Sequence, residues 1–214
     1  MKCVLCDKRK AKRSCPAKNG FICALCCGEN RVLELDCPEH CAYLIAGRER
    51  ESTDFGKLLQ IQEPLQREKN RRILSENQDV IAHLEYTIAQ YRLSSRDLKD
   101  KDVSQALEIL LDAYRTEDKG ILYEKGSDDL RVESVRLELK EILESYRNPE
   151  GDDAKGMVDP ANSRLKLQNA IECLELIQNM INVYSQNRNS DWGYVDFLAR
   201  MTPKKETKSS IILP

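Results

Sequence analysis

The chain has 214 residues, of which 33% are charged and 41% hydrophobic, and its formal net charge is −2. This composition predicts a folded, soluble chain rather than a disordered one. It contains no run of about 18 apolar residues, and its first residues, "MKCVLCDKRK", lack the apolar core of a secretory signal. The sequence therefore predicts no membrane span and no export, and the expected location is cytoplasmic.

Cysteine and charge are unevenly distributed. Eight of the nine cysteines fall within residues 3–41, and only Cys173 lies elsewhere. Residues 1–50 carry ten Lys/Arg and six Asp/Glu, whereas the whole chain is −2, so the N-terminal part is basic and the remainder acidic. Three segments are predicted: a cysteine-rich zinc-binding module at 1–47, a helical bundle domain at 48–201 and an extended tail at 202–214.

The cysteine spacing is typical of metal sites. In a reducing compartment, dense cysteines indicate metal binding rather than disulfides. Short C-x2-C and C-x3-C loops let two thiolates reach one tetrahedral ion. Eight thiolates divide into two sites of four, and the adjacent Cys26 and Cys27 have diverging side chains that would each face a different ion. The sequence therefore predicts two Zn²⁺ ions, with these ligands: Cys3, Cys6, Cys15, Cys23, Cys26, Cys27, Cys37 and Cys41.

Several alternatives stay open at this point. An iron–sulfur cluster also uses four cysteines, and a redox site would use the same residue type, although separated C-x2–3-C pairs fit tetrahedral zinc better. His40 could replace Cys41 as a ligand. The spacing also does not say which four cysteines share each ion.

The segments "CVLC", "RSCPAKNGFICALCC" and "CPEHC" together resemble the cross-braced zinc modules of the HIT and MYND type. The resemblance implies that Cys3 and Cys6 join Cys23 and Cys27 at the first zinc. It implies a second zinc held by Cys15, Cys26, Cys37 and Cys41. The chain departs from the family pattern at Lys18 and Asn19, which occupy the place of a further cysteine.

A second resemblance covers roughly residues 3–44. The segments "KRKAKRSCPAK", "ICALCCG" and "CPEHCAYL" are similar to those of a family of bacterial proteins that continue into a helical body and end in an apolar tail. No activity is established for that family. The resemblance therefore implies an architecture and not a function.

The remaining chain shows helical periodicity. One apolar stripe runs from Ile73 to Tyr91 and is interrupted by Asn77, and a second, with a capping-box-like start at Asp102-x-x-Gln105, stops at Gly120. Two more apolar stripes run over Val132–Tyr146 and Leu167–Tyr184, and a short further helix is expected over Trp192–Met201. The expected linker is 148–159. The predicted fold class is mainly α: a small N-terminal binuclear zinc module, with a hairpin near "GFICAL", followed by an antiparallel bundle of four to five helices.

No enzyme signature is recognised. The sequence has no glycine-rich phosphate loop, no Gly-x-Ser-x-Gly and no Glu-x-x-His pair, so we expect a non-catalytic protein. The first functional hypothesis is a zinc-stabilised adaptor that binds a protein partner. The alternative is an RNA- or DNA-binding protein, and its candidate phosphate contacts are Lys8, Arg9, Lys10, Lys12 and Arg13.

The basic cluster has a second explanation. Two four-cysteine zinc sites would each carry −2, and together they would cancel the excess positive charge of residues 1–50. At the other end of the chain, Ile211, Ile212 and Leu213 would each forgo roughly 2 kcal/mol of burial if left in water. We therefore expect the tail to dock on this chain or on a second copy, in which case a homodimer forms.

Overall fold

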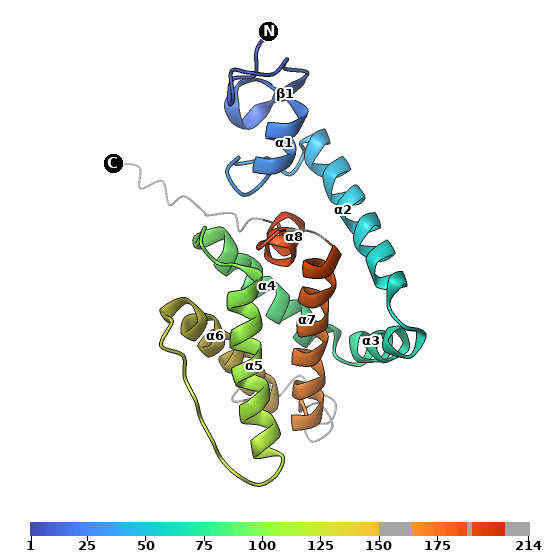
Figure 1. Ribbon diagram of the computed structural model, residues 1–214, viewed down its shortest axis with the longest axis vertical. Coiled ribbons are helices and arrows are strands. Elements are labelled where there is room, and N and C mark those ends of the chain that lie inside the picture. The colour runs from blue at the N-terminus through green and yellow to red at the C-terminus, as the bar shows by residue number, and fades with distance from the viewer. Residues whose placement is uncertain (150–163, 188–189, 204–214) are drawn as a thin grey trace, which may run out of the picture. The chain divides into compact units, whose positions relative to one another are not determined.

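The computed structural model describes residues 1–149, 164–187 and 190–203, and it is mainly helical (Figure 1). The chain divides into two compact units. The N-terminal unit comprises Met1–Arg48 together with the segment that begins at Arg200, and the helical unit comprises Glu49–Ala199. Within the described ranges, no helix is both long and apolar enough to cross a membrane.

The N-terminal unit is built around a small hairpin. Strand β1 (Arg13–Cys15) pairs antiparallel with β2 (Gly20–Ile22), and a 3-10 turn at Pro16–Lys18 joins them. Helix α1 (Ala24–Asn30) follows at once, and α2 (Ala42–Ile61) begins in this unit. The hairpin expected near "GFICAL" is present at β2. Five buried cysteines, Ile22 and Leu35 form the core of the unit, so sulfur supplies much of its interior.

The helical unit contains the remaining helices, and it confirms the mainly α class. Their bounds are α3 Pro64–Glu76, α4 Gln78–Ser94, α5 Asp100–Glu117, α6 Leu130–Arg147, α7 Leu167–Asn187 and α8 Gly193–Met201, of which the last two residues belong to the N-terminal unit. Helices α4, α5, α6 and α7 lie against one another (Figure 1). The apolar stripes predicted over α5, α6 and α7 face inward: Leu107, Leu139 and Leu174 are fully buried.

An aromatic cluster joins α2, α7 and α8 within the helical unit. The ring of Phe55 lies 5.5 Å from that of Tyr184 and 4.9 Å from that of Phe197, measured between centroids. Asp100, at the start of α5, accepts hydrogen bonds from the backbone N–H groups of Tyr194 and Val195. A buried carboxylate from one helix thus satisfies the free N–H groups at the start of another.

Two expected helix limits are wrong. The stripe from Ile73 to Tyr91 belongs to two helices, because the chain breaks at Asn77 with φ −132°. The Asn77 side chain donates to the carbonyl of Ile73, a local bond that competes with continued helix. Helix α5 begins at Asp100 rather than after Asp102, whose carboxylate instead accepts from the N–H of Lys99. Asp102 therefore lies inside the first turn and reaches back to cap it.

Helix α2 spans 20 residues, but no apolar stripe predicts it. Its fully buried residues are only Leu44 and Gly47. A helix that buries so little of its own surface gives a weak periodic signal. The linker expected at 148–159 lies largely outside the described residues, and so does the docking expected for 211–213.

Candidate metal centre

Four cysteines of the N-terminal unit converge. The sulfur atoms of Cys3, Cys6, Cys23 and Cys26 all lie within 4.8 Å of one another. Cys6 is half-buried and the other three are buried. Thiolates at about 2.3 Å from a tetrahedral zinc ion are roughly 3.8 Å apart, so little movement is needed for all four to reach one ion. This tetrad could bind a metal ion.

The backbone around the tetrad is shaped to hold it. Asp7 adopts a left-handed conformation with φ 48°, which turns the chain after Cys6 and directs the N–H groups of Lys8 and Arg9 toward the Cys6 sulfur. Cys23 is the N-cap of α1, and its sulfur accepts from the N–H of Cys26 at 3.4 Å. Backbone donors at both C-x-x-C loops are therefore directed at the sulfur atoms of the tetrad.

The thiols of the tetrad differ in pKa. Burial alone would raise the pKa of Cys3, but the N–H groups of Cys23, Cys6 and Leu5 lower it to about 6. A hydrogen bond with the Cys23 sulfur, together with burial, raises the pKa of Cys26 to about 12. The four sulfur atoms would bind a divalent cation as thiolates, so the cation would displace the protons of these thiols.

Arg9 brings positive charge to the tetrad. Its guanidinium hydrogen-bonds to Cys23 and lies within the field of Cys6 and Cys26, which raises the pKa of Arg9. A site of four thiolates around Zn²⁺ carries −2, so a neighbouring cation stabilises the deprotonated form. One of the five cations considered for nucleic acid thus already contacts the cysteine site.

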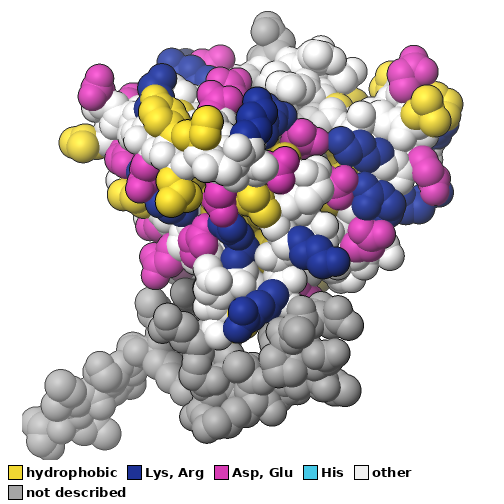
Figure 2. Space-filling view, turned by 90° about the horizontal axis from the view of Figure 1, so that it is seen from below, with side chains coloured by type: hydrophobic (Ala, Val, Ile, Leu, Met, Phe, Trp, Pro, Cys, Tyr) yellow, Lys and Arg dark blue, Asp and Glu magenta, His cyan; other side chains and the backbone are white. Residues whose placement is uncertain are grey.

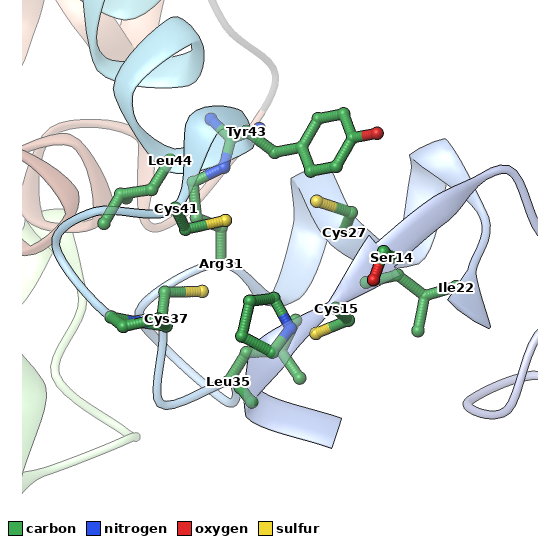
Figure 3. Close-up of a pocket in the computed structure, with 13 residues that line it drawn as sticks. Ser14, Cys15, Ile22, Cys27, Arg31, Leu35, Cys37, Cys41, Tyr43 and Leu44 are labelled. Atoms are coloured by element: carbon green, nitrogen blue, oxygen red, sulfur yellow. The ribbon is translucent and has the colours of Figure 1, made fainter. Parts of the chain in front are cut away.

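The other four N-terminal cysteines line one small cavity, drawn in Figure 3. These are Cys15, Cys27, Cys37 and Cys41. The cavity measures about 10 Å³, enough for one atom or ion and too small for an organic ligand. In Figure 3 the four sulfur atoms point inward from the hairpin, α1 and the loop that leads to α2. Burial, and the other three thiols, raise the pKa of Cys37.

The pairing implied by the HIT and MYND resemblance is wrong at one position. It placed Cys27 with Cys3, Cys6 and Cys23, whereas the structure places Cys26 there. The reason is helical phase: from the cap at Cys23, Cys26 is the residue whose N–H returns to the Cys23 sulfur. The next residue is turned about 100° around the helix, so Cys27 faces the second cavity. Cys41 lines that cavity, whereas His40 is exposed and does not.

Three further residues shape the second cavity, and the cysteine pattern did not identify them. Val32 holds φ 65°, an unusual conformation for a β-branched residue, and its N–H points at the Cys37 sulfur. Arg31 is buried and lines the cavity. A Cβ atom on Gly47 would lie 1.5 Å from Arg31 Nη1, so a larger residue at 47 would have to move this guanidinium.

Comparison with protein-family models, with curated proteins and with solved structures finds no match for this chain. The two resemblances therefore remain predictions. What the structure defines is a mainly helical protein with a cysteine tetrad, in its N-terminal unit, that could bind a metal ion.

Proposed function

We propose that this chain is a non-catalytic adaptor whose N-terminal unit is held together by two Zn²⁺ ions and whose helical unit binds a protein partner. The first ion would be bound by the tetrad. The second would be bound by Cys15, Cys27, Cys37 and Cys41, which line one ion-sized cavity. All-cysteine tetrahedral sites suit zinc better than the harder cations.

Arg31 supports the second zinc site. It is a buried arginine, and it lines the cavity of the four cysteines. Negative charge nearby stabilises a buried guanidinium, and a four-thiolate zinc site would supply such charge. At the tetrad, Arg9 hydrogen-bonds to Cys23. Each proposed site thus has one arginine beside it.

The observation that carries the protein-binding function is an apolar strip on the helical unit. The strip comprises Ile121, Leu122, Tyr123, Leu130 and Leu137. Leu122 is 90% exposed and Leu130 is 81% exposed, although both are large and aliphatic. Contiguous exposed apolar residues bordered by charge are typical of protein-interaction surfaces. Figure 2 shows one face of the molecule, where hydrophobic side chains gather in small groups among charges of both signs.

Anchoring contacts fix the strip in place. Between α5 and α6 the chain runs without regular secondary structure, yet Glu124 pairs with Lys140 and with Arg136 of α6. The Ser127 N–H donates to Glu133, one turn earlier on α6. This segment therefore follows α6. Leu130 and Leu137, seven residues apart, lie on the same side of that helix, and Ile121, Leu122 and Tyr123 directly precede the anchored segment.

The nucleic-acid alternative rests on Lys8, Lys10 and Lys12, which are exposed. The other two cations of the cluster have different contacts. Arg9 lies beside the tetrad, and the Arg13 guanidinium stacks at 4.9 Å from the centre of the Tyr43 ring. Since the proposed zinc sites would also offset the local positive charge, the adaptor is the better-supported function.

One experiment separates the two functions. Tagged protein is recovered from its host with and without nuclease, alongside the variant Leu122→Asp/Leu130→Asp. The matched control is Leu65→Asp, at a residue 87% exposed outside the strip. An adaptor retains its protein partner after nuclease treatment and loses it only in the strip variant. Loss of all partners on nuclease treatment, or binding that falls steeply with salt, would instead support the nucleic-acid function. Self-association that disappears in the strip variant would identify a second copy as the partner.

A further inference from the structure

The helical unit contains a cavity of about 400 Å³ that neither the metal sites nor the apolar strip uses. It lies between the end of α2, helix α3 and helix α7. Four of its lining residues, Arg67, Asn70, Arg71 and Leu74, recur at three- and four-residue spacing and so share one face of α3. The remaining lining residues are Leu59, Gln60, Gln62 and Met180. This volume is within the range of small-molecule sites.

One wall of the cavity is a fixed polar network. Asn70, which is only 6% exposed, donates to Gln62 Oε1 at 2.9 Å and accepts from Gln66 at 2.8 Å. Gln62 in turn donates to Asn179 Oδ1 on α7 at 3.3 Å. Because each amide orients the next, the wall is organised before any ligand arrives. The cavity is therefore a formed feature of the unit rather than a gap between loose side chains.

Two arginines, Arg67 and Arg71, bring positive charge to the rim of the cavity. Within the described part of the chain, the Arg67 guanidinium has no ion-pair or hydrogen-bond partner. Among the described residues Arg71 pairs with Glu68 alone, and both side chains are more than 70% exposed, so that pair is weak. Two arginines four residues apart on one helix repel each other. An anion between them would relieve that repulsion and could accept from both.

Another part of the lining is apolar. Leu59, Leu74 and Met180 line the cavity, and Leu74 is still 41% exposed. Guanidinium groups match carboxylate and phosphate oxygens, whereas these three side chains match aliphatic carbon. A purely polar anion would leave these apolar side chains in contact with water, and a neutral hydrocarbon would make no ionic contact with the arginines.

We propose that this cavity binds a small amphipathic anion. Arg67 and Arg71 hold a single carboxylate or phosphate head group, and a short aliphatic body rests on Leu59, Leu74 and Met180.

Calorimetric titration of the full chain tests this with four probes: octanoate, octyl phosphate, inorganic phosphate and hexanol, the first two below their micelle concentrations. One amphipathic anion should bind per chain at least tenfold more tightly than inorganic phosphate or hexanol. The comparison between octanoate and octyl phosphate identifies the head group.

The double variant Arg67→Gln/Arg71→Gln should weaken that binding at least tenfold, and Leu74→Asn should weaken it several-fold. Arg50→Gln, which removes an 85% exposed arginine of α2 outside the cavity, should leave it unchanged. Circular dichroism checks that each variant keeps its helix content. Equal affinity in the double variant, binding no tighter than that of inorganic phosphate, or no binding of either amphiphile would overturn the proposal.

Discussion

Gly47 lies against the guanidinium of Arg31: a Cβ atom at residue 47 would stand 1.5 Å from Nη1 and 2.2 Å from Cζ of that arginine. Arg31 follows α1 directly, and Gly47 lies in the second turn of α2. The contact therefore ties the start of α2 to the cavity lined by Cys15, Cys27, Cys37 and Cys41. Any change that moves Arg31 acts on the proposed second zinc site.

The first prediction compares two glycines of the same helix. Gly47→Ala must displace Arg31 from its buried place, and we expect a loss of about 1–3 kcal/mol in the stability of the N-terminal unit. Gly56→Ala is the matched control, because nothing lies within 4 Å of its added Cβ. There the gain in helix propensity should stabilise the protein by about 0.5–1 kcal/mol. Thermal unfolding of both variants measures the difference, and two changes of the same sign would refute the close contact.

The second prediction concerns metal removal. A unit of this size has too small a core to fold unaided, and structural zinc contributes about 10–16 kcal/mol per site in small modules. A chelator should therefore unfold the N-terminal unit while α3 to α7 stay helical, because their apolar residues pack on one another. Proteolysis should then cut within residues 1–48 first. Loss of most of the far-ultraviolet helical signal on chelation would contradict this independence.

The third prediction tests how the cysteines pair. Cobalt(II) bound by four thiolates gives strong charge-transfer absorption, so each site can be counted by titration. Cys26→Ser should abolish the tetrad site and leave the second site intact, whereas Cys27→Ser should do the reverse. The variants differ by one position along α1, so each is the control for the other. If Cys27→Ser removes the site that contains Cys3, the pairing seen in the structure is wrong.

The fourth prediction is a pH dependence of the helical unit. Burial raises the pKa of Asp100 from 3.8 to about 6, although the N–H groups of Tyr194 and Val195 oppose the shift. Between these values the folded state keeps a proton that the unfolded state has lost. The contribution of Asp100 to stability therefore falls as pH rises from about 4 to about 6, by an amount on the order of 3 kcal/mol.

Denaturant unfolding at several pH values measures this slope. Asp100→Asn should flatten it, while the exposed Asp128→Asn should leave it unchanged. The comparison uses slopes rather than absolute stabilities, because the Asp100→Asn substitution also removes one acceptor from the N-terminus of α8. Burial raises the pKa of Glu85 as well, so a smaller slope of the same sign should remain. A steeper fall in the Asp100→Asn variant would rule out this assignment.

Much of the architecture is predictable from spacing alone. Cysteine pairs separated by two or three residues indicated metal ligands, and the stripes through Leu107, Leu139 and Leu174 identified buried helix faces. These features are local, so the sequence contains the full signal. Helix α2 lacks such a signal, because it buries few of its own residues.

The details that escaped prediction depend on backbone geometry. Whether Cys26 or Cys27 joins the tetrad follows from the helix phase set by the cap at Cys23, because C-x2-C and C-x3-C spacings both suit a metal site. The partnership of Arg31 with Gly47 depends on how α2 approaches the end of α1. A sequence shows the arginine and the glycine, but it does not show that they touch.

The most direct test of the account is the metal content of the intact protein. Native mass spectrometry and elemental analysis of protein purified without chelators should both return two zinc ions per chain. Cys26→Ser and Cys27→Ser should each return one. Finding no metal, or iron with visible absorbance, would contradict the two-zinc N-terminal unit on which the proposed adaptor rests.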